Sequence, residues 1–66
     1  MEQLINVPFH LTHRAEMLER RMGELREELL EGEDGTTADD LALNAIRLEG
    51  IIGEARELVA ELRQLY

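Results

Sequence analysis

Apolar residues recur at heptad spacing along two stretches of the chain, which are separated by one short polar break. A repeat of 3.5 residues places one apolar seam on each of two helices, and a short connection makes such helices antiparallel neighbours. The sequence therefore predicts an all-α fold, an antiparallel coiled-coil-like hairpin of two helices. The two predicted seams are Leu11, Ala15, Leu18, Met22, Leu25 and Leu29, then Leu41, Ala45, Leu48, Ile52, Ala55, Val59, Leu62 and Tyr66.

The first helix is predicted over about residues 12–31. It is expected to begin between Pro8, which is suited to a first-turn position, and Thr12, a plausible N-cap. Gly32 is the natural residue for a left-handed C-cap at its end. Residues 1–11 are expected to form an N-terminal arm, because Pro8 cannot lie inside a helix without breaking it. The arm is either a frayed terminus or a flap that covers the open end of the hairpin core.

A polar turn is expected over residues 32–37, followed by the second helix over about 38–66. Thr37 is its predicted N-cap, with Asp40 at the capping-box position. The ligand register of a calcium loop is absent. The acids around the turn are therefore expected to give solubility, or to attract a basic partner. This acidic tip consists of Glu31, Glu33, Asp34, Asp39 and Asp40.

The second helix carries more apolar surface than one neighbouring helix can cover. Three apolar residues recur seven apart beside its seam, and others lie on the side away from the seam. Gly50 and Gly53 lie within this helix and cost about 1 kcal/mol each. Such a cost is usually tolerated where another backbone approaches closely, and the alternative is that the two glycines are neutral surface positions. We predict a partner-binding surface formed by Leu43, Ile46, Gly50, Ile51, Gly53, Leu58 and Leu65.

Size and charge restrict the classes of function. A chain of 66 residues buries only about 60% of its unfolded surface, and a two-helix hairpin buries less, so the missing stability is expected to come from association. The net charge is −8 and every basic residue is an Arg interleaved with acids, which argues against nucleic acid and anionic membranes as partners. With no signal peptide and no run of about 18 apolar residues, no membrane span is expected and the cytoplasm is the default compartment.

Catalytic and metal-binding patterns are not found in the sequence. The chain contains no Ser and no Cys, and it has no glycine-rich phosphate loop. His10 and His13 are three residues apart, but they lack the further ligands of a structural zinc site and are expected to lie on the surface. We therefore expect no enzymatic activity, no cofactor and no metal.

The segment Asn44-Ala45-Ile46-Arg47-Leu48-Glu49-Gly50-Ile51, continued through Ala55, Val59 and Tyr66, resembles the second helix of the small E-type co-chaperones of bacterial type III secretion systems. Leu25-Arg26-Glu27-Glu28-Leu29-Leu30 is similar to a run in their first helix, before a Gly-containing turn. The resemblance covers about residues 15–66. Family members often have a Gln-aromatic-Gln stretch after the turn, where this chain has Thr37-Ala38-Asp39-Asp40-Leu41.

The resemblance implies a non-catalytic co-chaperone. Such hairpins bind a larger helical-repeat chaperone, and the pair keeps the needle subunit monomeric before export. Two other classes stay open from the residues alone. One is a homodimeric four-helix bundle that serves as a regulatory or structural module, with the chain forming a homodimer when alone. The other is an adaptor that binds a kinase or a phosphatase.

Overall fold

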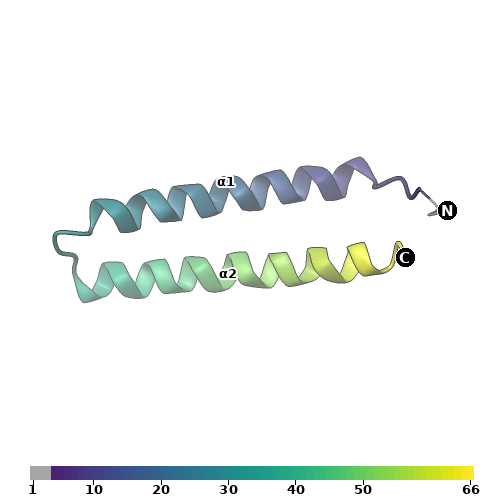
Figure 1. Ribbon diagram of the computed structural model, residues 1–66. Helices are drawn as coiled ribbons and strands as arrows, with labels where there is room; N and C mark the ends of the chain where they lie inside the picture. The colour runs from purple at the N-terminus through teal and green to yellow at the C-terminus, as the bar shows by residue number, and fades with distance from the viewer. Residues whose placement is uncertain (1–3) are drawn as a thin grey trace.

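The computed structural model describes residues 4–66 and contains two helices joined by a short turn (Figure 1). Helix α1 spans Phe9–Glu31 and helix α2 spans Ala38–Arg63. The helices lie side by side and run in opposite directions, giving a hairpin of 53 × 20 × 16 Å (Figure 1). The predicted all-α antiparallel hairpin is confirmed.

Helix α1 begins at Phe9, within the predicted interval and three residues before Thr12. Pro8 occupies the N-cap position with φ −58° and ψ 139°, a conformation that its ring favours. Its carbonyl oxygen accepts hydrogen bonds from the N–H groups of Leu11 at 3.0 Å and Thr12 at 3.5 Å. Thr12 therefore lies inside the helix and does not cap it.

The N-terminal arm does not cover the hairpin core over the residues that can be described. Residues 1–3 of the expected arm, 1–11, lie outside the described part of the chain. Residues 4–8 are not helical, and Leu4 is 94% exposed, so the Leu4 side chain covers no part of the core. Leu11 belongs to α1 and is buried.

The turn differs in one respect from the expected geometry. Gly32 has φ −87° and ψ 9°, so the prediction of a left-handed C-cap there is wrong. The residue with positive φ is Gly35, at +148°, and its N–H donates to the carbonyl oxygen of Gly32 at 3.0 Å. Thr37 caps α2 as predicted, because its hydroxyl accepts a hydrogen bond from the N–H of Asp40 at 3.1 Å.

The core is a narrow strip between the two helices. Only four apolar side chains are buried among the described residues, Leu11, Leu25, Ile51 and Leu58, with exposures of 3–7%. The half-buried apolar residues beside them complete the strip, which contains no buried polar or charged residue among those described. These half-buried residues are Leu18, Leu48, Ala55, Leu62 and Leu65.

The position of Ile51 and Leu58 corrects the sequence interpretation of α2. They were expected outside the seam, on a surface free for a partner, but they face α1 and Leu65 beside them is half-buried. Conversely, Ile52 and Val59 were expected in the seam and are exposed. Heptad spacing fixes how many apolar stripes a helix has, whereas the rotation of each stripe toward its neighbour depends on the contacts that form on either side.

The backbone at Gly35 leads to a stability prediction. Gly35→Ala should lower the free energy of unfolding by about 1 to 3 kcal/mol, because a side chain is strained at φ +148°. Gly23→Ala is the matched control: its new Cβ meets no atom within 4 Å, so the higher helix propensity of Ala should stabilise the hairpin. Urea unfolding followed by circular dichroism measures both. Equal stabilisation by the two substitutions would contradict the turn geometry.

Burial of Ile51 predicts that a charge at this position unfolds the hairpin itself. Ile51→Asp should abolish most of the helical signal, since an unpaired carboxylate in an apolar core costs several kcal/mol. Ile46→Asp, on the same helix but 65% exposed, should leave the helical signal nearly unchanged. Circular dichroism at one protein concentration compares the variants. A folded Ile51→Asp variant would place Ile51 outside the core.

Candidate interaction surfaces

One flank of the hairpin is lined by three ion pairs between the helices. Arg14 pairs with Glu61, Arg21 with Glu54, and Arg47 with Glu28. Arg14 also lies 3.9 Å from Glu57. The paired residues recur every seven positions on each helix, so the charges follow the same antiparallel register along the whole contact. We call this row the ion-pair flank.

The ion pairs contribute more to alignment than to stability. Their side chains are between 35% and 76% exposed, and solvent-exposed pairs typically contribute about 0 to 1 kcal/mol each. Because opposite charges face each other only in this register, they disfavour sliding and rotation of the helices. The pairs therefore favour the register and rotation in which Leu11, Leu25, Ile51 and Leu58 are buried.

The opposite flank carries exposed apolar residues on both helices. In α1, a step of three residues from the buried Leu11 or the half-buried Leu18 leads to Arg14 or Arg21 on the ion-pair flank. A step of four residues leads to the opposite side of the contact between the helices. In α2, a step of four residues from the half-buried Leu48 or Ala55 leads to Ile52 or Val59, on the side away from the ion-pair flank. Since the helices are antiparallel, both sets lie on one side of the hairpin. This apolar face consists of Ala15, Met22, Leu29, Leu41, Ala45, Ile52 and Val59, all of them exposed.

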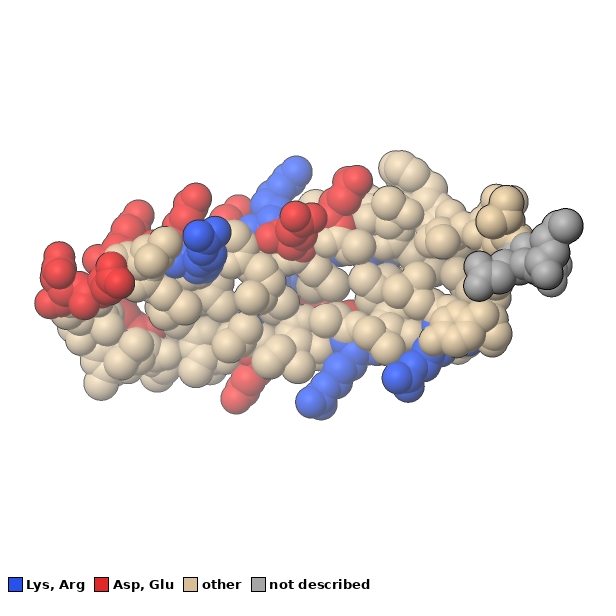
Figure 2. Space-filling view, in the orientation of Figure 1, with Lys and Arg blue, Asp and Glu red and all other residues tan. Residues whose placement is uncertain are grey.

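The space-filling view shows such a surface. An uncharged band follows both helices along the hairpin, and charged side chains project mainly from the two long edges and from the end at the turn (Figure 2). A band of this kind is a candidate contact surface, because a contiguous exposed apolar patch usually marks a site of association.

A second, smaller surface lies on the far side of α2. A Cβ added at Gly50 would lie 3.9 Å from the guanidinium of Arg21, so this surface borders the ion-pair flank and points away from the apolar face. Ile46 is 65% exposed, and a Cβ added at Gly53 would meet nothing within 4 Å. The outer patch of α2 consists of Leu43, Ile46, Gly50 and Gly53. These are the four predicted partner-binding residues that the fold leaves fully on the surface.

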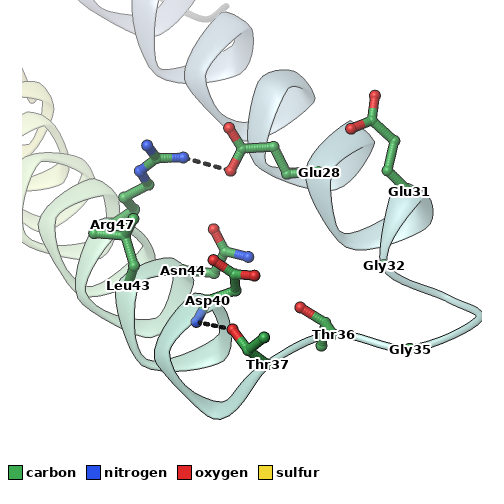
Figure 3. A pocket seen from close by; sticks show the side chains of 10 residues that line it. All are labelled: Glu28, Glu31, Gly32, Gly35, Thr36, Thr37, Asp40, Leu43, Asn44 and Arg47. Atoms are coloured by element: carbon green, nitrogen blue, oxygen red, sulfur yellow. Dashed lines mark hydrogen bonds and ion pairs between the residues drawn. The ribbon is translucent and has the colours of Figure 1, made fainter.

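A shallow hollow opens where the end of α1, the turn and the start of α2 meet (Figure 3). The Arg47–Glu28 ion pair lies at one side of this hollow, and the hydrogen bond from the Asp40 N–H to the Thr37 hydroxyl lies on the α2 side (Figure 3). The charged groups here are mainly acidic, and Arg47 is already paired.

The two histidines are on the surface of the first turns of α1. His13 stacks on Phe9 with ring centroids 6.1 Å apart. Over residues 4–66, no group of three His, Cys, Asp or Glu side chains is placed to hold a metal ion. Neither helix in that range is long and apolar enough to cross a membrane.

Comparison of the chain with known proteins identifies no matching family, and no curated protein or solved structure matches it significantly. Functional inference therefore depends on the surfaces of the hairpin and on the sequence resemblance described above.

Proposed function

We propose that this protein is a non-catalytic co-chaperone of type III secretion that acts in the cytoplasm and binds a helical-repeat chaperone through the outer patch of α2. The observation that carries the proposal is the exposure of Ile46, at 65%, beside two helical glycines. The family resemblance includes the same segment, Asn44 to Ile51. Together with the repeat chaperone, the hairpin would keep the needle subunit monomeric before export.

The chemistry of the outer patch suits a helical groove. Stacked helical repeats form extended concave surfaces, and an amphipathic helix binds such a groove through apolar residues three, four and seven positions apart. Leu43, Ile46, Gly50 and Gly53 have this spacing. The glycines leave room for a neighbouring backbone, and removing Leu43 and Ile46 from water contributes about 25 cal/mol per Å² of apolar surface.

Binding of this kind also stabilises the hairpin. Four buried apolar side chains are a small core, and a partner that binds only the folded form shifts the folding equilibrium toward it. The acidic tip adds a salt-dependent attraction if the chaperone presents basic residues there. We expect this electrostatic contribution to be secondary to the apolar contact.

Co-expression with the repeat chaperone and the needle subunit of the same secretion system tests the proposal. The unmodified chain should co-purify with both, and without the chain the chaperone should become insoluble or be degraded. Ile46→Asp should reduce recovery of the chaperone at least tenfold, because it places a carboxylate in the apolar contact.

Arg20→Asp is the control, since Arg20 is exposed on α1 and belongs to neither apolar surface nor the ion-pair flank. It should leave recovery of the chaperone nearly unchanged. Equal losses with Ile46→Asp and Arg20→Asp, with both variants folded, would show that the outer patch is not the binding surface. A chain that recovers no chaperone at all would contradict the proposed function.

A further inference from the structure

We infer that a second copy of this chain covers the apolar face, so that two hairpins form an antiparallel four-helix bundle. This inference concerns a different surface from the outer patch and does not depend on the proposed function. It also specifies the arrangement of the two copies: α1 lies against α1 of the second copy and α2 against its α2.

The heptad stripes of both helices point to one side of the hairpin. In a four-helix bundle every helix has two neighbours, and its heptad stripe points between them, toward the common centre. The hairpin has this geometry: one half of each stripe, such as Leu18 and Leu48, lies toward the other helix, and the other half, such as Met22 and Ile52, is exposed on the apolar face. The stripes point toward a centre that one hairpin does not contain.

Each helix also has one acidic and one basic residue at the edge of the apolar face. On α1, Glu19 lies three residues before Met22 and Arg26 lies four after it. On α2, Glu49 and Arg56 have the same spacing about Ile52. A two-fold axis that runs perpendicular to the helices and crosses the apolar face over Met22 and Ile52 therefore brings Glu19 of each copy to Arg26 of the other. It likewise brings each Glu49 to Arg56 of the other copy.

The axis crosses both helices at nearly the same position along the hairpin, because Met22 and Ile52 lie close to the same height. Arg21 pairs with Glu54, which places Met22 and Ile52 within about one helical turn of each other along the hairpin axis. One axis perpendicular to the helices then satisfies all four rim charges of each copy. The isologous contact is the commonest symmetry of soluble homodimers.

The acidic tip decides between this arrangement and its rival. A two-fold axis parallel to the helices would also match the rim charges, pairing Glu19 with Arg56, but it would place the two acidic tips side by side. The perpendicular axis places the two tips at opposite ends of the bundle. Like-charge repulsion therefore favours the perpendicular axis.

The size of the face is sufficient for a stable contact. A standard interface buries about 800 Å² on each partner. The hairpin measures 53 × 20 × 16 Å, and the apolar face lies on its broad side, where both helices contribute. A full-length contact therefore reaches the standard size.

Single cysteines test the arrangement directly, because the natural chain contains none. With a short bismaleimide, Met22→Cys should cross-link to itself in high yield, and so should Ile52→Cys. Ile46→Cys, on the outer patch, is the matched control and should give little cross-linked product. If the two cysteines cross-link only in a mixture of the Met22→Cys and Ile52→Cys proteins, the parallel axis is correct and our arrangement is wrong. If neither variant nor their mixture gives a cross-linked product, the inference that a second copy covers the apolar face is wrong.

Charge exchange provides a second test that leaves the apolar residues intact. Glu19→Arg alone should weaken the dimer roughly tenfold, since two Arg–Arg contacts replace two ion pairs. Combining it with Arg26→Glu should restore the unmodified dissociation constant in sedimentation equilibrium. Under the parallel axis the double variant would be weaker than the single one, which would contradict our arrangement.

A matched pair on α2 separates this inference from the proposed function. Ile52→Asp should abolish the dimer while Ile46→Asp retains it, and binding of the repeat chaperone should show the reverse pattern. If Ile52→Asp unfolds when alone, its recovery in complex with the chaperone still reports the outer patch. An Ile52→Asp variant that stays dimeric would contradict the inference and leave the co-chaperone proposal unaffected.

Discussion

The structure depends on one geometric constraint: two helices in contact can each bury only a narrow strip. Among the described residues, four side chains are buried in that strip, and far more large apolar residues stay on the surface, including Ile46 and Ile52. In a domain with a third layer these residues would enter the core. The hairpin instead presents them on two surfaces, the apolar face and the outer patch of α2, and these surfaces are the candidates for association.

The ion pairs determine how that apolar surface is divided. Because Arg21 pairs with Glu54 and Arg47 with Glu28, both helices turn the same flank toward each other, and the rest of each heptad stripe is displaced to the opposite side. The outer patch borders the ion-pair flank and the apolar face lies across the hairpin from it. A second copy on the apolar face would therefore leave both outer patches free, and a dimer would be able to bind chaperone on each side.

The fold could be predicted from the sequence because heptad spacing and a short break define two antiparallel helices. The cap at Thr37 was also predictable from its distance to Asp40. The rotation of each helix about its own axis was not predictable from the apolar spacing. The sequence interpretation therefore assigns Ile51 and Leu58 to a partner surface, although they form part of the core. The charges at heptad spacing on both helices contained this information, because only one antiparallel register pairs them. The start of α1 at Phe9 lies within the predicted interval between Pro8 and Thr12, but the N-cap itself, Pro8, makes no side-chain hydrogen bond that would distinguish it from Thr12 in the sequence.

Thermal unfolding of the unmodified chain over about a hundredfold range of concentration, combined with sedimentation equilibrium, tests most directly whether the hairpin requires association. When folding is coupled to association, the midpoint temperature depends on concentration. The account predicts a dimer whose Tm rises with concentration. A monomer with a high Tm that is independent of concentration would contradict it.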